Sequence, residues 1–143
     1  MDRSIRRVIH TTSATAAAIG ALLSPFPLLD ELFLAPLYGL MALRIGRLHA
    51  LGPTAIPWHP IARTTMNGLL ARAGANLAFA LIPGVSAAAN ALSAAALSEW
   101  LGRYFDASCD APAEASSVPI GVIVADLRAY VSSLRQQATA PAV

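Results

Sequence analysis

A weak internal repeat constrains this chain more than any other feature of its sequence. When the sequence is aligned with itself at an offset of 56 residues, Pro27 falls on Pro83 and Asp30 falls on Ser86. Each copy thus has a proline followed three residues later by a residue type that caps helix N-termini. Internal self-similarity of this kind usually marks a repeated supersecondary unit. The sequence therefore predicts two related helical hairpins.

The ends of the two copies match as well. Each copy closes with an aliphatic-Gly-Arg motif, Ile45-Gly46-Arg47 in the first and Leu101-Gly102-Arg103 in the second. Residues 51–60 contain Gly52 and three prolines, which favour a loop between the copies. We expect one duplicated helical-hairpin domain over residues 1–106, with repeats at about 8–50 and 64–106.

Proline turns and apolar periodicity predict an all-α fold of two Ala-rich helical hairpins and a C-terminal amphipathic helix. Pro27 and Pro83-Gly84 are expected at the hairpin turns, with Asp30 and Ser86 as structural N-caps. Residues 118–137 carry one apolar stripe at three- and four-residue spacing, which indicates the amphipathic helix. The helices are expected at 5–24, 31–49, 60–81, 87–105 and 119–137, with a polar linker at 107–117 and a tail at 138–143.

The composition favours a protein that lies partly in a membrane. Hydrophobic residues make up 56% of the chain and charged residues 13%, about half the share usual in soluble domains. Residues 73–98 carry no charge, but Pro83-Gly84 divides them into pieces too short to cross a bilayer alone. Three alanines at four-residue spacing, Ala87, Ala91 and Ala95, form a face that permits close helix packing. We expect membrane-embedded hairpins with transmembrane or re-entrant helices, and the alternative is a soluble or peripheral bundle.

Several chemistries are disfavoured by the residues themselves. All ten basic residues are arginine, so a phosphate-binding loop with its lysine and a Schiff-base lysine are both impossible in this chain. Cys109 is the single cysteine, and His10, His49 and His59 are scattered, so we expect no metal site. A formal charge of +2 is too weak for nucleic-acid binding. We therefore expect no catalytic residue and no cofactor.

An enzyme that uses Asp30 and Glu31 together with Arg47 or Arg103 is the least favoured interpretation. Two carboxylates at a helix start are stabilised there by the helix dipole, without any catalytic purpose.

Residues 8–106 resemble the YcjF-like helical domain, which is often attached behind bacterial Ras-like GTPase domains and associated with membranes. The resemblance depends on four short motifs, Pro27 to Asp30, Ile45-Gly46, Leu81 to Asn90, and Leu101 to Phe105. It implies membrane association and a protein partner, whereas no nucleotide chemistry carries over because the chain has no phosphate-binding loop.

The sequence as a whole predicts a non-enzymatic membrane-associated protein at the cytoplasmic (inner) membrane. It would act as an anchor, a scaffold or an assembly partner, and a separate GTPase is one candidate for the protein that it assembles with. The expected partners are the lipid bilayer and a protein or a second copy of the chain. The alternative is a soluble helical bundle in the cytoplasm that oligomerises or binds an apolar ligand.

Overall fold

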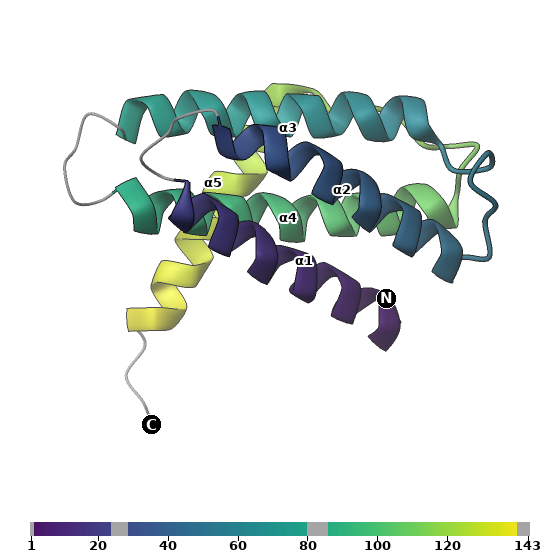
Figure 1. Cartoon of the computed structure of the whole chain (residues 1–143), viewed down its shortest axis with the longest axis horizontal. Coiled ribbons are helices and arrows are strands. Elements are labelled where there is room, and N and C mark those ends of the chain that lie inside the picture. Colours follow the sequence, from purple (N-terminus) through teal and green to yellow (C-terminus); the bar gives the residue numbers. More distant parts are fainter. Residues whose placement is uncertain (1, 24–28, 80–85, 140–143) are drawn as a thin grey trace.

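Five helices make up the structure, a computed structural model that describes residues 2–23, 29–79 and 86–139 (Figure 1). Four of them form a bundle and the fifth crosses it, so the predicted all-α fold is confirmed. Pro27, Pro83 and Gly84 lie outside the described residues, as does the side chain of Ser86. The helices are α1 (Arg3–Leu22), α2 (Leu29–Leu48), α3 (Trp58–Phe79), α4 (Ser86–Asp110) and α5 (Ile120–Thr139).

The two hairpins run in the same direction along the bundle. α1 and α3 finish at one end, where α2 and α4 begin; we call this the tip end (Figure 1). The first residues of α1 and α3 and the last residues of α2 and α4 lie at the opposite, base end (Figure 1).

The helix ends follow local hydrogen bonding. α1 begins after Asp2, whose carboxylate accepts a 3.0 Å hydrogen bond from the backbone N–H of Ser4, as an N-cap does. Ala50, two residues after the end of α2, has a φ of 57°. The N–H of Leu51 donates to the carbonyl of Gly46 at 2.9 Å. This left-handed residue with its backward hydrogen bond is a Schellman cap, in which alanine occupies the position that glycine favours.

The polar linker predicted at 107–117 is wrong at its start. α4 continues through Asp110, because Ser108 and Cys109 are buried and Cys109 belongs to the hydrophobic core. The connection between α4 and α5 is therefore residues 111–119.

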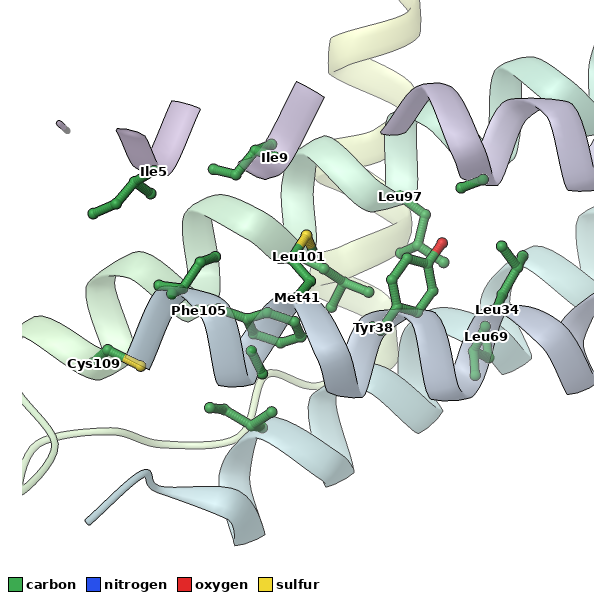
Figure 2. Packing of buried hydrophobic residues seen from close by; sticks show 14 of the residues in the cluster. Ile5, Ile9, Leu34, Tyr38, Met41, Leu69, Leu97, Leu101, Phe105 and Cys109 are labelled. Atoms are coloured by element: carbon green, nitrogen blue, oxygen red, sulfur yellow. The ribbon is translucent and has the colours of Figure 1, made fainter. Parts of the chain in front are cut away.

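Buried side chains occur at matching positions of the two hairpins. Figure 2 shows the core between them, with Tyr38 and Met41 of α2 facing Leu97 and Leu101 of α4. At the offset of 56 residues, buried residues coincide as Ile5 with Ile61, Ala16 with Arg72, Leu34 with Asn90, Met41 with Leu97, Ile45 with Leu101, and Gly46 with Gly102.

Two glycines allow α1 to approach α4, a helix of the other hairpin. A Cβ atom on Gly20 of α1 would lie 2.9 Å from the carbonyl oxygen of Asn90 on α4. Farther along the same pair, a Cβ on Gly102 would lie 2.6 Å from Cγ1 of Ile9. Ser13 adds a 3.2 Å hydrogen bond to the carbonyl of Ala95. Small residues thus allow α1 to lie directly against α4.

α5 is attached through the segment that precedes it. The side-chain amide of Asn67 on α3 donates to the carbonyl of Val118 at 2.8 Å, and the N–H of Val118 donates to Thr64 Oγ1 at 2.9 Å. Ile123 of the predicted apolar stripe is fully buried, and Leu127 packs against the core.

Candidate functional site

A buried arginine joins α2, α3 and α4 near the tip end. Arg72 of α3 donates from Nη2 to Asp30 Oδ2 at 2.6 Å and from Nη1 to Glu31 Oε1 at 2.5 Å. The side chains of Arg72 and Asp30 are each 1% exposed. A charge taken this far from water is stable only when it is paired and hydrogen-bonded, so the two carboxylates are what make the buried guanidinium possible.

Asn90 extends the cluster to the first helix. Its Oδ1 accepts from Arg72 Nη2 at 2.6 Å, and its Nδ2 donates to the carbonyl of Gly20 on α1 at 2.9 Å and to Asp30 Oδ2 at 3.1 Å. We call Asp30, Glu31, Arg72 and Asn90 the ion cluster. It ties together all four helices of the bundle.

Two carboxylates share one guanidinium in this cluster. Burial raises the pKa of Glu31 from its ordinary value of 4.5 to about 7; Arg72 opposes this shift and Asp30 adds to it. Among the described residues, Glu31 Oε2 and Arg72 Nε are buried and have no hydrogen-bond partner. When Glu31 is protonated, the charges of Asp30 and Arg72 cancel. When Glu31 is ionised, Asp30, Glu31 and Arg72 together carry one negative charge.

Asp30 was interpreted from the sequence as a helix N-cap, but it lies at the second residue of α2. Its Oδ1 accepts from the N–H of Glu31 at 3.1 Å, and its Oδ2 is the acceptor for Arg72 and Asn90. The main role of this carboxylate is therefore a tertiary ion pair between α2 and α3.

Sequence reasoning missed Arg72 and Asn90, although the repeat contained a signal for them. Arg72 aligns with Ala16 and Asn90 aligns with Leu34 at the offset of 56 residues, and all four positions are buried. A polar residue at a core position of a repeat implies a polar partner, since an unpaired one would be costly.

Charge is unevenly distributed along the four-helix bundle. Its described tip half, residues 11–23, 29–40, 64–79 and 86–98, contains no Asp, Glu or Arg except the three of the ion cluster. The described base half carries seven exposed arginines, and none of them forms an ion pair there. These arginines are Arg3, Arg6, Arg7, Arg44, Arg47, Arg63 and Arg103.

The tip end also exposes large apolar side chains. Leu22 at the end of α1 is 77% exposed, and Leu32 and Phe33 in the first turns of α2 are 70% and 51% exposed. Leu29 beside them is exposed too. Large apolar side chains exposed together at one end of a bundle are typical of surfaces that bind a partner or a lipid.

Several hydroxyl groups in the tip half donate to a backbone carbonyl of their own helix. Thr15 Oγ1 donates to the carbonyl of Thr11 at 2.9 Å, and Ser98 Oγ donates to the carbonyl of Ala94 at 2.8 Å. Ser93 Oγ likewise donates to the carbonyl of Asn90 at 3.0 Å. A hydroxyl that already donates to a backbone carbonyl does not need a water molecule as its acceptor. This lowers the free-energy cost of an apolar environment for the tip half.

The expected transmembrane helix is not found: within residues 2–23, 29–79 and 86–139, no helix combines the length and apolarity that crossing a bilayer requires. The predicted packing face of α4 is also only partly buried. Ala87 is exposed and Ala91 and Ala95 are half-buried, while Ala94 is fully buried and lies against Gly20.

The repeat-end motifs separate into two roles. Gly46 and Gly102 are buried, and a Cβ on either one would come within 2.6 Å of an isoleucine side chain. Arg47 and Arg103, the next residues, are exposed. Arg47 and Arg103 therefore lie outside the ion cluster, and the structure brings neither of them to Asp30 or Glu31.

A second polar cluster lies near the base end. His49, the residue after α2, has its Nε2 2.8 Å from Asp106 Oδ1 of α4 and its Nδ1 3.9 Å from Asp110 Oδ1. Burial raises the pKa of the nearby Cys109 thiol, with a further contribution from Asp106. A thiol that is kept protonated is a poor nucleophile. The contacts of His49 with Asp106 and Asp110 link the end of α2 to α4.

Aromatic side chains line a shallow depression of about 440 Å³ between α4 and α5. Trp100 and Tyr104 stack with ring centroids 5.9 Å apart, and Trp100 Nε1 donates to Asp126 Oδ2 at 3.1 Å. Arg103 also lines the depression, beside the two rings.

No protein-family model, curated protein or solved structure matches this chain.

Proposed function

We propose that this chain is a non-enzymatic, membrane-associated helical protein whose tip half enters one leaflet of a bilayer. The separation of charge along the bundle carries this proposal. All charged groups of the tip half are turned toward one another in the ion cluster, while Leu22, Leu32 and Phe33 are turned outward. A hydrocarbon environment would therefore meet apolar side chains and no unpaired charge on this half.

The length of the uncharged half supports insertion into a single leaflet. The helical rise gives about 17 Å from Thr11 to Leu22 and about 18 Å from Ser86 to Ser98. The hydrocarbon core of a bilayer is about 30 Å thick, so one leaflet contributes about 15 Å. This depth fits a bundle end that dips into the membrane without crossing it.

The exposed side chains would supply the attraction. A leucine or phenylalanine that is half to three-quarters exposed gains roughly 1 to 2 kcal/mol when it leaves water. Leu22, Leu32 and Phe33 together are enough for reversible binding to a lipid surface. The base half would remain in water as an anchor or scaffold, and the separate GTPase partner expected from the resemblance stays a prediction.

Vesicle flotation with phosphatidylcholine tests the proposal, because the headgroups of these vesicles have no net charge and binding then depends on insertion of the tip half. We expect wild-type protein to float with the vesicles and Leu32→Glu to bind at least ~10-fold more weakly, since a charge near the bilayer centre costs about 3 kcal/mol. Leu48→Glu is the matched control: Leu48 is also exposed and on α2, but at the base end. This variant should bind as wild type does.

Two outcomes would overturn the proposal. One is wild-type protein that does not float, and the other is equal binding by the Leu32→Glu and Leu48→Glu variants. If the wild type fails to float and elutes as an oligomer that Leu32→Glu dissociates, the uncharged end is a self-association surface. The alternative of an oligomerising bundle then replaces membrane association.

A further inference from the structure

Six exposed arginines lie at similar distances from the tip-side ends of their helices, namely Arg6, Arg7, Arg44, Arg47, Arg63 and Arg103. Four of these arginines, one on each helix of the bundle, occupy matching positions of the two repeats. The internal repeat relates them in pairs: Arg7 aligns with Arg63 and Arg47 aligns with Arg103 at the offset of 56 residues. All four are exposed, and none is in an ion pair with another described residue. We call Arg7, Arg47, Arg63 and Arg103 the arginine ring.

Each arginine of the ring lies at a similar distance along its own helix from the end of that helix at the tip, although α3 and α4 extend farther there than α1 and α2 (Figure 1). Counting from the described helix ends at the tip, Arg7 lies about 22 Å away, Arg63 about 24 Å, Arg103 about 26 Å and Arg47 about 27 Å. A tip end near the bilayer midplane would put the headgroup layer about 15 to 22 Å from it. An arginine side chain can extend its guanidinium several ångströms along the helix toward that layer.

The described acidic groups near the ring form no ion pair with its arginines. The two acids of α4 on either side of this level approach histidines instead: Glu99 Oε1 is 2.7 Å from His10 Nδ1, and Asp106 Oδ1 is 2.8 Å from His49 Nε2. Asp126 of α5 lines the depression together with Arg103 and accepts a hydrogen bond from Trp100 Nε1. Trp100 and Tyr104 lie beside Arg103 in the open depression, and such rings are enriched at the headgroup level of membranes.

We propose that the arginine ring binds the anionic phospholipid headgroups of the bilayer that receives the tip half. This inference rests on the proposed function and adds a lipid class to it. Guanidinium groups pair with phosphate through two parallel hydrogen bonds, so four unpaired arginines at similar distances along their helices form a fitting collar for phosphate headgroups. The two repeats would each contribute the same two contacts, one from each helix.

Two sets of vesicles test the inference, phosphatidylcholine alone and phosphatidylcholine mixed with phosphatidylglycerol. Wild-type protein should bind the anionic vesicles more tightly, and added salt should remove the difference. Each basic residue near an anionic surface contributes roughly fivefold in affinity. The variant Arg7→Gln/Arg47→Gln/Arg63→Gln/Arg103→Gln should therefore lose at least ~10-fold on anionic vesicles and nothing on neutral ones.

The control keeps the charge at the same positions. Arg7→Lys/Arg47→Lys/Arg63→Lys/Arg103→Lys should retain most of the preference for anionic vesicles, and circular dichroism verifies that both variants keep their helices. If wild type binds both vesicles equally, or if the glutamine variant keeps the preference, the ring does not recognise headgroups, while insertion of the tip half still stands. If wild type binds neither vesicle, the proposed function itself fails.

Discussion

Arg72 Nη2 lies 2.6 Å from Asp30 Oδ2, and both side chains are almost completely withdrawn from water. The two residues are 42 positions apart in the sequence and belong to α3 and α2. The pair therefore links the second hairpin to the first at the end where the described bundle carries no Asp, Glu or Arg outside the ion cluster.

Removal of the buried guanidinium should be strongly destabilising. Arg72→Leu leaves Asp30 and Glu31 close together without their cation, and loss of one partner of a buried ion pair costs about 3 to 5 kcal/mol. Urea unfolding followed by circular dichroism measures the change. Arg63→Leu is the matched control, because Arg63 is exposed on the same helix and its loss should cost at most about 0.5 kcal/mol. Equal unfolding midpoints for the two variants would contradict the role of the ion cluster.

Stability should depend on pH through Glu31. Its pKa is about 7 in the folded protein and 4.5 ordinarily, so between these values the folded state holds a proton that the unfolded chain has released. The free energy of unfolding should therefore fall as pH rises from about 4.5 to about 7, and this contribution should be constant above that range. Thermal melts without lipid measure the slope.

Glu31→Gln should flatten that part of the profile, since glutamine does not titrate and its carbonyl can still accept from Arg72 Nη1. The control is Glu114→Gln, because Glu114 is exposed in the connection between α4 and α5. An unchanged slope in Glu31→Gln would show that another group is responsible.

The contact between α1 and α4 should not tolerate a methyl group at Gly20. The added Cβ would lie 2.9 Å from the backbone oxygen of Asn90, and a backbone atom can move only if the helices separate. Gly20→Ala should destabilise the protein by about 1 to 3 kcal/mol. Gly39→Ala, with no atom near the added methyl, should instead stabilise α2 by about 0.5 to 1 kcal/mol. Opposite shifts of the melting temperature are thus expected, and shifts of the same sign would contradict the close packing.

The Schellman cap of α2 offers a stabilising substitution. Ala50 holds a φ of 57°, a conformation that costs a side-chain-bearing residue about 1 to 2 kcal/mol and costs glycine nothing. Ala50→Gly should raise the free energy of unfolding by about 1 kcal/mol. The same exchange at Ala62, exposed within α3, should lower it by about 1 kcal/mol. A destabilised Ala50→Gly variant would mean that α2 ends differently.

Local patterns were sufficient for the fold class and for most helix bounds. Prolines, capping residue types and the apolar stripe of α5 are effects within a few residues of one another, and such effects can be read from a single sequence. The end of α4 was predicted too early, because Ser108 and Cys109 look like linker residues until the neighbouring helix that buries them is known. The predicted packing face of α4 contains Ala95, whereas the fully buried residue is its neighbour Ala94. This difference also depends on where the neighbouring helix lies.

The sequence by itself determined an all-α chain, two related hairpins, and a charge distribution that leaves residues 73–98 without an ionisable group. Only the tertiary structure decided what Asp30 does. A carboxylate at a helix start satisfies a local rule whether or not an arginine is near, and its partner Arg72 comes from another helix. The tertiary structure likewise gathered Arg7, Arg47, Arg63 and Arg103 in the base half of one bundle, one on each helix, because neighbouring helices of the bundle run in opposite directions.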